Sequence, residues 1–63
     1  MQDIYSKYHY EKVWRKTSLK DLERIISEEL SDAPIAETLK YVIDSCAAGK
    51  TVSLIDVSFR DHA

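Results

Sequence analysis

The sequence has little of what small proteins use to reinforce a fold. One cysteine, one glycine and one proline occur in 63 residues. A single thiol excludes an intramolecular disulfide, and no spacing of Cys and His is typical of a metal site. Scarce glycine and proline, beside 44% hydrophobic residues, argue against a disordered or loop-rich chain. We therefore expect a single small domain, residues 1–63, with no cofactor and no metal.

Long apolar segments are also missing. No run approaches the roughly 20 residues that span a bilayer, and the N-terminal residues MQDIYSKYHY lack the apolar core of a signal peptide. A lone thiol fits a reducing compartment. These features predict a cytoplasmic protein that makes no membrane contact.

Catalytic motifs are missing as well. The segment AAGKT at 47–51 lacks the upstream glycine of a phosphate-binding loop, and neither G-x-S-x-G nor H-E-x-x-H occurs. Cys46 lies on an apolar helix face, which favours packing over nucleophilic chemistry. His9 and His62 have no partner at ligand spacing, so we expect them on the solvated surface. The sequence predicts a binding protein and not an enzyme.

An amphipathic helix is predicted over residues 18–30. Its apolar residues recur at helical spacing, and they are Leu19, Leu22, Ile25, Ile26 and Leu30. Ser18 and Asp21 form a capping pattern at its start, although Thr17 is an alternative cap. Arg24 and Glu28 are one turn apart and of opposite charge, which adds support to the helix.

A second helix is predicted after Pro34, which is tolerated in a first helical turn. Its apolar stripe consists of Ile35, Leu39, Val42, Ile43 and Cys46. Ser31 or Asp32 can cap its start, and Gly49 is placed to end it in the left-handed conformation. Because the connection is short, the two helices should form an antiparallel hairpin.

Both ends of the chain are predicted as strands. In the N-terminal segment one phase of an alternation holds Ile4, Tyr8, Tyr10 and Trp14, and the other holds Lys7, His9, Glu11 and Arg15. The segment 50–59, KTVSLIDVSF, is rich in residues that favour strands. Its alternation is imperfect, which requires a bulge or two partly buried faces. A short helix capped by Ser53 and Asp56 is the competing interpretation.

The resulting order is strand, helix, helix, strand, an α+β fold, with a small all-α helical bundle as the alternative. Two strands alone are marginal in water. A chain of this size also buries only about 60% of its unfolded surface. Edge pairing between two copies would give a four-stranded sheet, so we expect a homodimer.

The first 16 residues carry the candidate binding surface. Four of the six aromatic residues of the chain lie there, interleaved with basic groups. The candidate residues are Tyr5, Lys7, Tyr8, His9, Tyr10, Lys12, Trp14, Arg15 and Lys16. Residues 1–20 hold five basic and two acidic groups, a net +3, which leaves −5 for the rest of a chain with net charge −2. This asymmetry can steer an anionic partner to the N-terminal segment.

Several interpretations of these rings stay open. They can form the core, a dimer interface, a surface for a partner protein, or a stacking platform for single-stranded nucleic acid. The acidic net charge argues against binding of duplex DNA. Tyr5 is out of phase with the other rings and is the best candidate to stay exposed. We expect a protein partner, with nucleic acid as the alternative.

The block YHYEKVWRKTSLKDLERIISEEL at 8–30, together with the total length, resembles small accessory proteins of lambda-like temperate bacteriophages. Such proteins are encoded in the early leftward region, between the recombination and excisionase genes. The resemblance implies early expression in a bacterial host, dispensability for plaque growth, and influence on the host cell cycle or on the choice between lysis and lysogeny. It brings no catalytic residues and no agreed binding residues. We expect the partner to be a host or phage protein.

Overall fold

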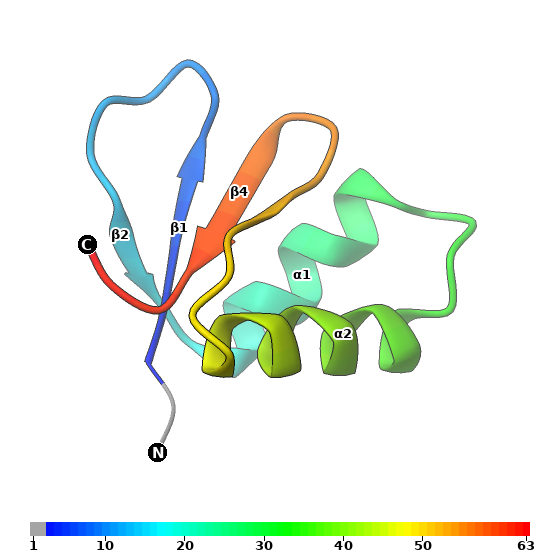
Figure 1. Ribbon diagram of the computed structural model, residues 1–63. Helices are drawn as coiled ribbons and strands as arrows, with labels where there is room; N and C mark the ends of the chain where they lie inside the picture. Colours follow the sequence, from blue (N-terminus) through cyan, green and yellow to red (C-terminus); the bar gives the residue numbers. More distant parts are fainter. Residues whose placement is uncertain (1–2) are drawn as a thin grey trace.

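Both ends of the chain lie in one antiparallel β-sheet. A computed structural model describes residues 3–63. The elements are β1 (Ile4–Tyr8), β2 (Arg15–Thr17), α1 (Leu19–Glu29), α2 (Ile35–Ala47), β3 (Val52–Ser53) and β4 (Val57–Arg60). The strand order is β2-β1-β4-β3, so the first and last strands are the central pair (Figure 1). The predicted α+β class is confirmed.

Helix α1 forms as its sequence pattern predicts. The Ser18 hydroxyl accepts a hydrogen bond from the Asp21 backbone N–H at 3.2 Å, which satisfies a free donor at the helix start. Arg24 donates to Glu28 at 3.3 Å across one exposed turn. The middle of the predicted stripe is buried, and its buried members are Leu22, Ile25 and Ile26. Leu19, at the N-terminal end of the stripe, is exposed.

Helix α2 ends as expected but begins differently. Gly49 adopts a φ of +79°, the left-handed conformation that glycine permits without steric cost. The prediction that Ser31 or Asp32 caps the start is wrong, because Pro34 itself occupies the N-cap position and no side chain caps the helix. With φ −68° and ψ 111° Pro34 is extended, so the helix begins at Ile35, two or three residues later than a cap at Asp32 or Ser31 would place it.

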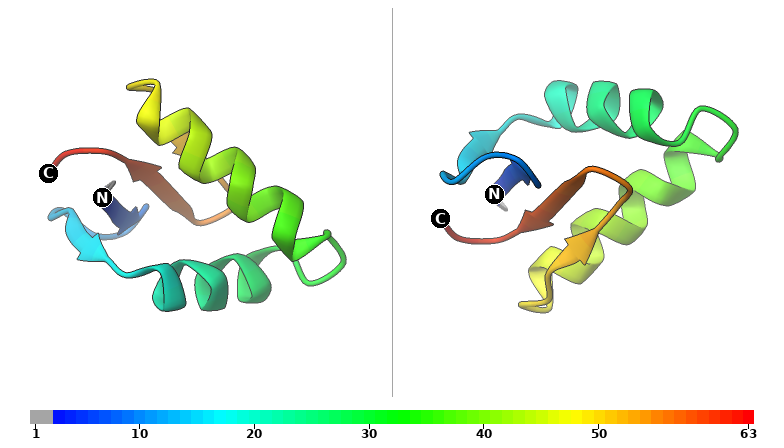
Figure 2. Two further views of the ribbon diagram at one scale, coloured as in Figure 1. Left: turned by 90° about the horizontal axis from the view of Figure 1, so that it is seen from below. Right: turned by 90° about the horizontal axis from the view of Figure 1, so that it is seen from above.

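The chain runs in opposite directions in the two helices, which diverge from their connecting loop, and both helices lie on the same side of the sheet (Figure 2). Among residues 3–63 no helix is long and apolar enough to cross a membrane.

The N-terminal segment is a hairpin and not the single predicted strand. After Tyr8 the chain reverses, and the Glu11 N–H donates to the Tyr8 carbonyl at 2.9 Å. β2 then returns beside β1, with Lys16 opposite Tyr5 and Arg15 opposite Ser6. An alternating apolar pattern can continue through a turn in the sequence. The pattern does not show that residues after the turn have changed face, so it did not reveal this reversal.

The C-terminal segment is also a hairpin. Leu54 donates its N–H to the Val57 carbonyl at 2.7 Å, which closes a turn between β3 and β4. This turn explains the imperfect alternation of the sequence, and the alternative of a short helix capped by Ser53 and Asp56 is wrong. One chain therefore supplies all four strands of the sheet. A second copy is not needed to complete the sheet, so this reason for expecting a homodimer is removed.

The core lies between the helices and one face of the sheet. It consists of Ile4, Val52, Val57 and Phe59 from the strands and Leu22, Ile25, Ile26, Val42 and Cys46 from the helices. Residues directly opposite each other on paired strands share a face, so Phe59 of β4 lies beside Val52 of β3 on the covered face. Phe59 is the largest of the fully buried side chains.

We predict that Phe59→Ala lowers the free energy of unfolding by about 3–5 kcal/mol, because it removes buried apolar surface and leaves a cavity. A loss of that size unfolds much of so small a domain. Ile55→Ala in the same hairpin is the matched control, since Ile55 is 65% exposed and should cost less than about 0.5 kcal/mol. Urea unfolding followed by circular dichroism measures both, and equal losses would contradict this description of the core.

Candidate binding surface on the uncovered sheet face

Helices α1 and α2 both lie against one face of the sheet, and neither covers the second face (Figure 2). The residues of that second face follow from strand register. Tyr5 of β1 lies between Lys16 of β2 and Arg60 of β4. One step along the strands, Lys7 lies opposite Ser58, which lies opposite Ser53. We call this face, with Trp14 and His9 at its margin, the open face. It consists of Tyr5, Lys7, His9, Trp14, Lys16, Ser53, Ser58 and Arg60.

Trp14 is the aromatic centre of the open face. The Arg60 guanidinium carbon lies 3.9 Å from the centroid of its ring, and the Lys7 ammonium lies 5.6 Å from the same centroid. Cations over an indole ring are attracted by its negative face, and each such contact contributes about 0.5–1 kcal/mol at an exposed site. The ring therefore holds two basic groups from β1 and β4 close together.

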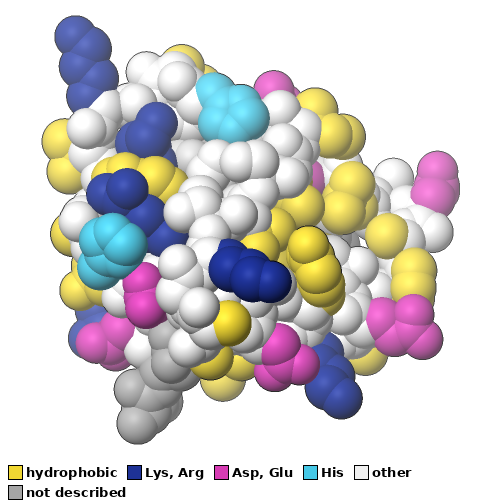
Figure 3. Space-filling view, viewed as in Figure 1, with side chains coloured by type: hydrophobic (Ala, Val, Ile, Leu, Met, Phe, Trp, Pro, Cys, Tyr) yellow, Lys and Arg dark blue, Asp and Glu magenta, His cyan; other side chains and the backbone are white. Residues whose placement is uncertain are grey.

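Space-filling atoms show the resulting charge distribution (Figure 3). In this view Lys and Arg side chains gather on the side of β1 and β2, around a hydrophobic side chain, while acidic groups are found over the helices and along the lower edge. Of the basic residues predicted in the N-terminal segment, Lys7 and Lys16 thus lie on the open face.

Sequence reasoning missed Arg60, which lies near the C-terminus, far along the chain from its neighbour Tyr5 in the sheet. A signal was present in the C-terminal strand. Val57 and Phe59 are apolar alternate residues, so Ser58 and Arg60 must point to the opposite face once the strand is correctly bounded. What no local pattern supplied was the pairing of β4 with β1.

Glu11 organises the loop that carries Trp14. Its carboxylate accepts the Tyr8 backbone N–H at 3.1 Å and pairs with the Arg15 guanidinium at 2.7 Å, while its carbonyl accepts from Lys7 at 3.2 Å. The Glu11 side chain is only 15% exposed. Hydrogen bonds to an ionised, partly buried group are stronger than neutral ones, so they hold the loop closely against the end of β1.

A chain of hydrogen bonds crosses the far side of the open face. His9 Nε2 lies 3.2 Å from Ser58 Oγ, which lies 3.0 Å from Ser53 Oγ. His9 is exposed as expected, but it has a partner that the sequence did not indicate. A serine nucleophile needs an accessible hydroxyl, and Ser58 is only 9% exposed. These hydrogen bonds therefore order the surface, and His9 and Ser58 do not form a base and nucleophile for hydrolysis.

The remaining candidate rings lie elsewhere. Tyr8 packs against the core, and burial raises the pKa of its phenol, helped by the nearby Glu28 carboxylate. Tyr10 stacks on Tyr8 with centroids 5.6 Å apart but is 81% exposed at the hairpin turn. The prediction that Trp14 shares the phase of Tyr8 is wrong, because the reversal after Tyr8 moves Trp14 to the opposite face, whereas Tyr10 in the turn stays beside Tyr8.

Two candidate cations also separate from the others. Arg15 lies opposite Ser6, whose side chain is buried on the covered side, and forms its ion pair with Glu11. The prediction that Arg15 shares a face with Lys7 and His9 is therefore wrong, again because of the reversal. Lys12 is exposed in the loop between the two strands.

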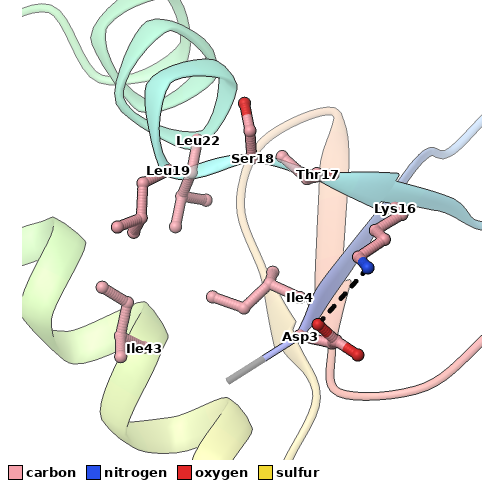
Figure 4. A pocket seen from close by; sticks show the side chains of 8 residues that line it. All are labelled: Asp3, Ile4, Lys16, Thr17, Ser18, Leu19, Leu22 and Ile43. Carbon is pink, nitrogen blue, oxygen red and sulfur yellow. Dashed lines mark ion pairs between the residues drawn. The ribbon is translucent and has the colours of Figure 1, made fainter. Parts of the chain in front are cut away.

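An apolar hollow of about 400 Å³ opens between the ends of β1 and β2, the start of α1 and α2 (Figure 4). Leu19, Leu22, Ile4 and Ile43 point into it. On its polar rim Lys16, which also belongs to the open face, pairs with the exposed Asp3 carboxylate at 3.6 Å, and Ser18 caps α1. This hollow therefore offers apolar surface with little polar guidance for a ligand.

Cys46 is buried in the core, in agreement with the packing prediction. Burial raises the pKa of its thiol, and the Asp61 carboxylate adds to the shift, so the reactive thiolate is scarce at neutral pH. At the C-terminus His62 hydrogen-bonds Asp61 at 2.7 Å and thereby lowers the pKa of that carboxyl group. Within residues 3–63, no cluster of three or more His, Cys, Asp or Glu side chains could hold a metal ion.

We predict that Cys46 reacts with a thiol reagent about a thousandfold more slowly in the native protein than in urea, since modification requires unfolding. The absorbance of the released chromophore gives both rates. A native rate like that of a free exposed thiol would contradict the burial of Cys46.

Comparisons with protein-family models, with curated proteins and with solved structures gave no significant match to this chain.

Proposed function

We propose that this protein acts by binding and not by catalysis, and that the open face receives an acidic region of a partner protein. One observation carries the proposal: cations and aromatic rings from three strands gather on a sheet face that no helix covers. Trp, Tyr and Arg are the residue types that dominate binding energy at protein interfaces. Lys7, Lys16 and Arg60 supply the charge, and Tyr5 and Trp14 supply apolar contact area.

The state of Trp14 favours a protein over a nucleic acid. Bases stack on aromatic rings whose faces are free. Here the Arg60 guanidinium lies 3.9 Å from the ring centroid, with Lys7 also nearby, so a base would have to displace a favourable contact. Carboxylates need no such displacement, because they can bind to the N–H groups of the cations where they are.

The cellular setting in this proposal follows from the resemblance to small accessory proteins of lambda-like temperate bacteriophages. The partner is then a host or phage protein in the bacterial cytoplasm. Its capture would influence the host cell cycle or the balance between lysis and lysogeny. An acidic patch on such a partner would be steered to the open face by charge.

We predict that the triple variant Lys7→Glu, Lys16→Glu, Arg60→Glu loses capture of the partner from a bacterial lysate. Like charges would then face each other across the interface, which costs several kcal/mol and lowers capture at least about a hundredfold. Quantitative mass spectrometry of proteins retained on the immobilised chain measures this loss.

A second triple variant gives the matched control for that experiment. Lys20→Glu, Lys40→Glu, Lys50→Glu changes the net charge equally, and all three residues are exposed outside the open face. A partner that the wild type and this control retain, and the open-face variant loses, supports the proposal. Equal loss in both variants, or no loss in either, refutes it, provided circular dichroism shows that both are folded.

Single-stranded nucleic acid is the second candidate, and the position of Tyr5 favours it. Tyr5 lies on a central strand of the sheet with Lys16 on one side and Arg60 on the other, an arrangement in which a base could stack between two phosphate contacts. A labelled oligonucleotide distinguishes the two candidates. Binding at low micromolar concentration that falls steeply with salt would replace the protein-partner proposal.

The homodimer is also part of the proposal, and it now depends on the small size of the domain alone. We predict that sedimentation velocity at low micromolar concentration gives the mass of a dimer, because association would bury apolar surface that a small chain leaves exposed. A folded monomer at that concentration would remove the dimer from the proposal and leave the binding function intact.

A further inference from the structure

We infer that Trp14, Arg60 and Lys7 form a carboxylate-binding subsite, which anchors an Asp or Glu side chain of the partner. The inference deepens the proposed function and rests on it for the identity of the partner as a protein. It adds a defined place on the open face and a defined chemical group. The three residues come from the β1–β2 loop, from β4 and from β1.

The Arg60 guanidinium is held in place before any ligand binds. It lies against the Trp14 ring, and its Nε donates to the His62 carbonyl at 2.8 Å. No hydrogen bond or ion pair within residues 3–63 uses its two terminal nitrogens. A guanidinium fixed at both places loses little conformational entropy on binding, so its terminal N–H groups are prepared for a bidentate contact.

Lys7 supplies the second charge of the subsite. Its ammonium donates to the Glu11 carbonyl at 3.2 Å, which leaves donors for a ligand and keeps the group near the indole. Two carboxylates near these cations form hydrogen bonds to other groups. That of Glu11 binds the Tyr8 N–H and Arg15, and that of Asp61 hydrogen-bonds His62, while the charge of Arg60 helps to lower the pKa of Asp61. The terminal donors of Arg60 and the remaining donors of Lys7 therefore stay available to an external carboxylate.

The shape of the subsite favours a carboxylate on a side chain. A planar carboxylate can accept two parallel hydrogen bonds from the terminal N–H groups of a guanidinium. The apolar stem of a glutamate can pack beside the indole at the same time. Tyr5, in the strand between Lys16 and Arg60, extends the apolar area next to this position.

The chain carries its own reporter for this site, because Trp14 is its one tryptophan. The experiment titrates the full chain at low ionic strength with a blocked tetraglutamate peptide and follows tryptophan emission. We expect a saturable change with a dissociation constant of about 1 mM or tighter. A blocked tetraglutamine peptide should give no such change. The inference is overturned if the tetraglutamate peptide gives no saturable change up to a concentration of about 10 mM.

Two further titrations test the chemical class of the ligand. Inorganic phosphate that saturates the emission change at a lower concentration than the glutamate peptide would overturn the assignment to carboxylate. A tetraglutamine peptide with a free C-terminal carboxylate tests the other source of this group. If it alone binds, the subsite recognises chain ends and the assignment to side chains is wrong.

Arg60→Lys tests the guanidinium specifically, since it keeps the charge and loses the planar pair of donors. We expect about a tenfold loss of peptide affinity. Arg24→Lys is the matched control, because Arg24 is exposed on α1, and its affinity should equal that of the wild type. If Arg60→Lys and Arg24→Lys bind the peptide with equal affinity, net charge alone explains the binding and the subsite is refuted.

Failure of the subsite is distinguishable from failure of the proposed function. If the peptide does not bind but the open-face triple variant loses the partner, the binding function stands and the subsite is wrong. If the peptide binds at Trp14 but that triple variant still captures the partner, the subsite stands and the proposed role of the open face is wrong.

Discussion

The pairing of β1 with β4 is the constraint on which the rest of this structure depends. Tyr8 lies opposite Val57 and Tyr5 opposite Arg60, so the two ends of the chain form the centre of the sheet. Closing a loop of this length costs entropy that grows only slowly with the number of residues, and the free energy released by burying the core must exceed that cost. With this pair in place, each remaining strand adds to it through a short hairpin.

The same pairing separates the structural and the functional chemistry of the chain. On the covered face it brings Ile4 and Tyr8 beside Val57 and Phe59, where both helices complete the core. On the open face it brings Arg60 next to Tyr5 and within reach of Trp14. Because successive strand residues point to opposite sides, one set of hydrogen bonds builds a core and a basic surface together.

The helices were predictable because their information is local. The spacing of Leu22, Ile25 and Ile26, the cap at Ser18 and the stop at Gly49 each act within one or two turns. The strands were not bounded correctly. The reversal between Tyr8 and Glu11 contains no glycine or proline, and its hydrogen bonds come from a carboxylate and a carbonyl whose roles appear only in three dimensions.

The sequence by itself determined the two helices, their apolar faces, the α+β class and the concentration of basic and aromatic residues near the N-terminus, because periodicity and composition are local properties. Only the tertiary structure decided which of those residues share a surface. It moved Trp14 to the face of Lys7, placed Tyr8 against the core and added Arg60 from the other end of the chain. Strand register carries that information, and register depends on contacts between residues far apart in sequence.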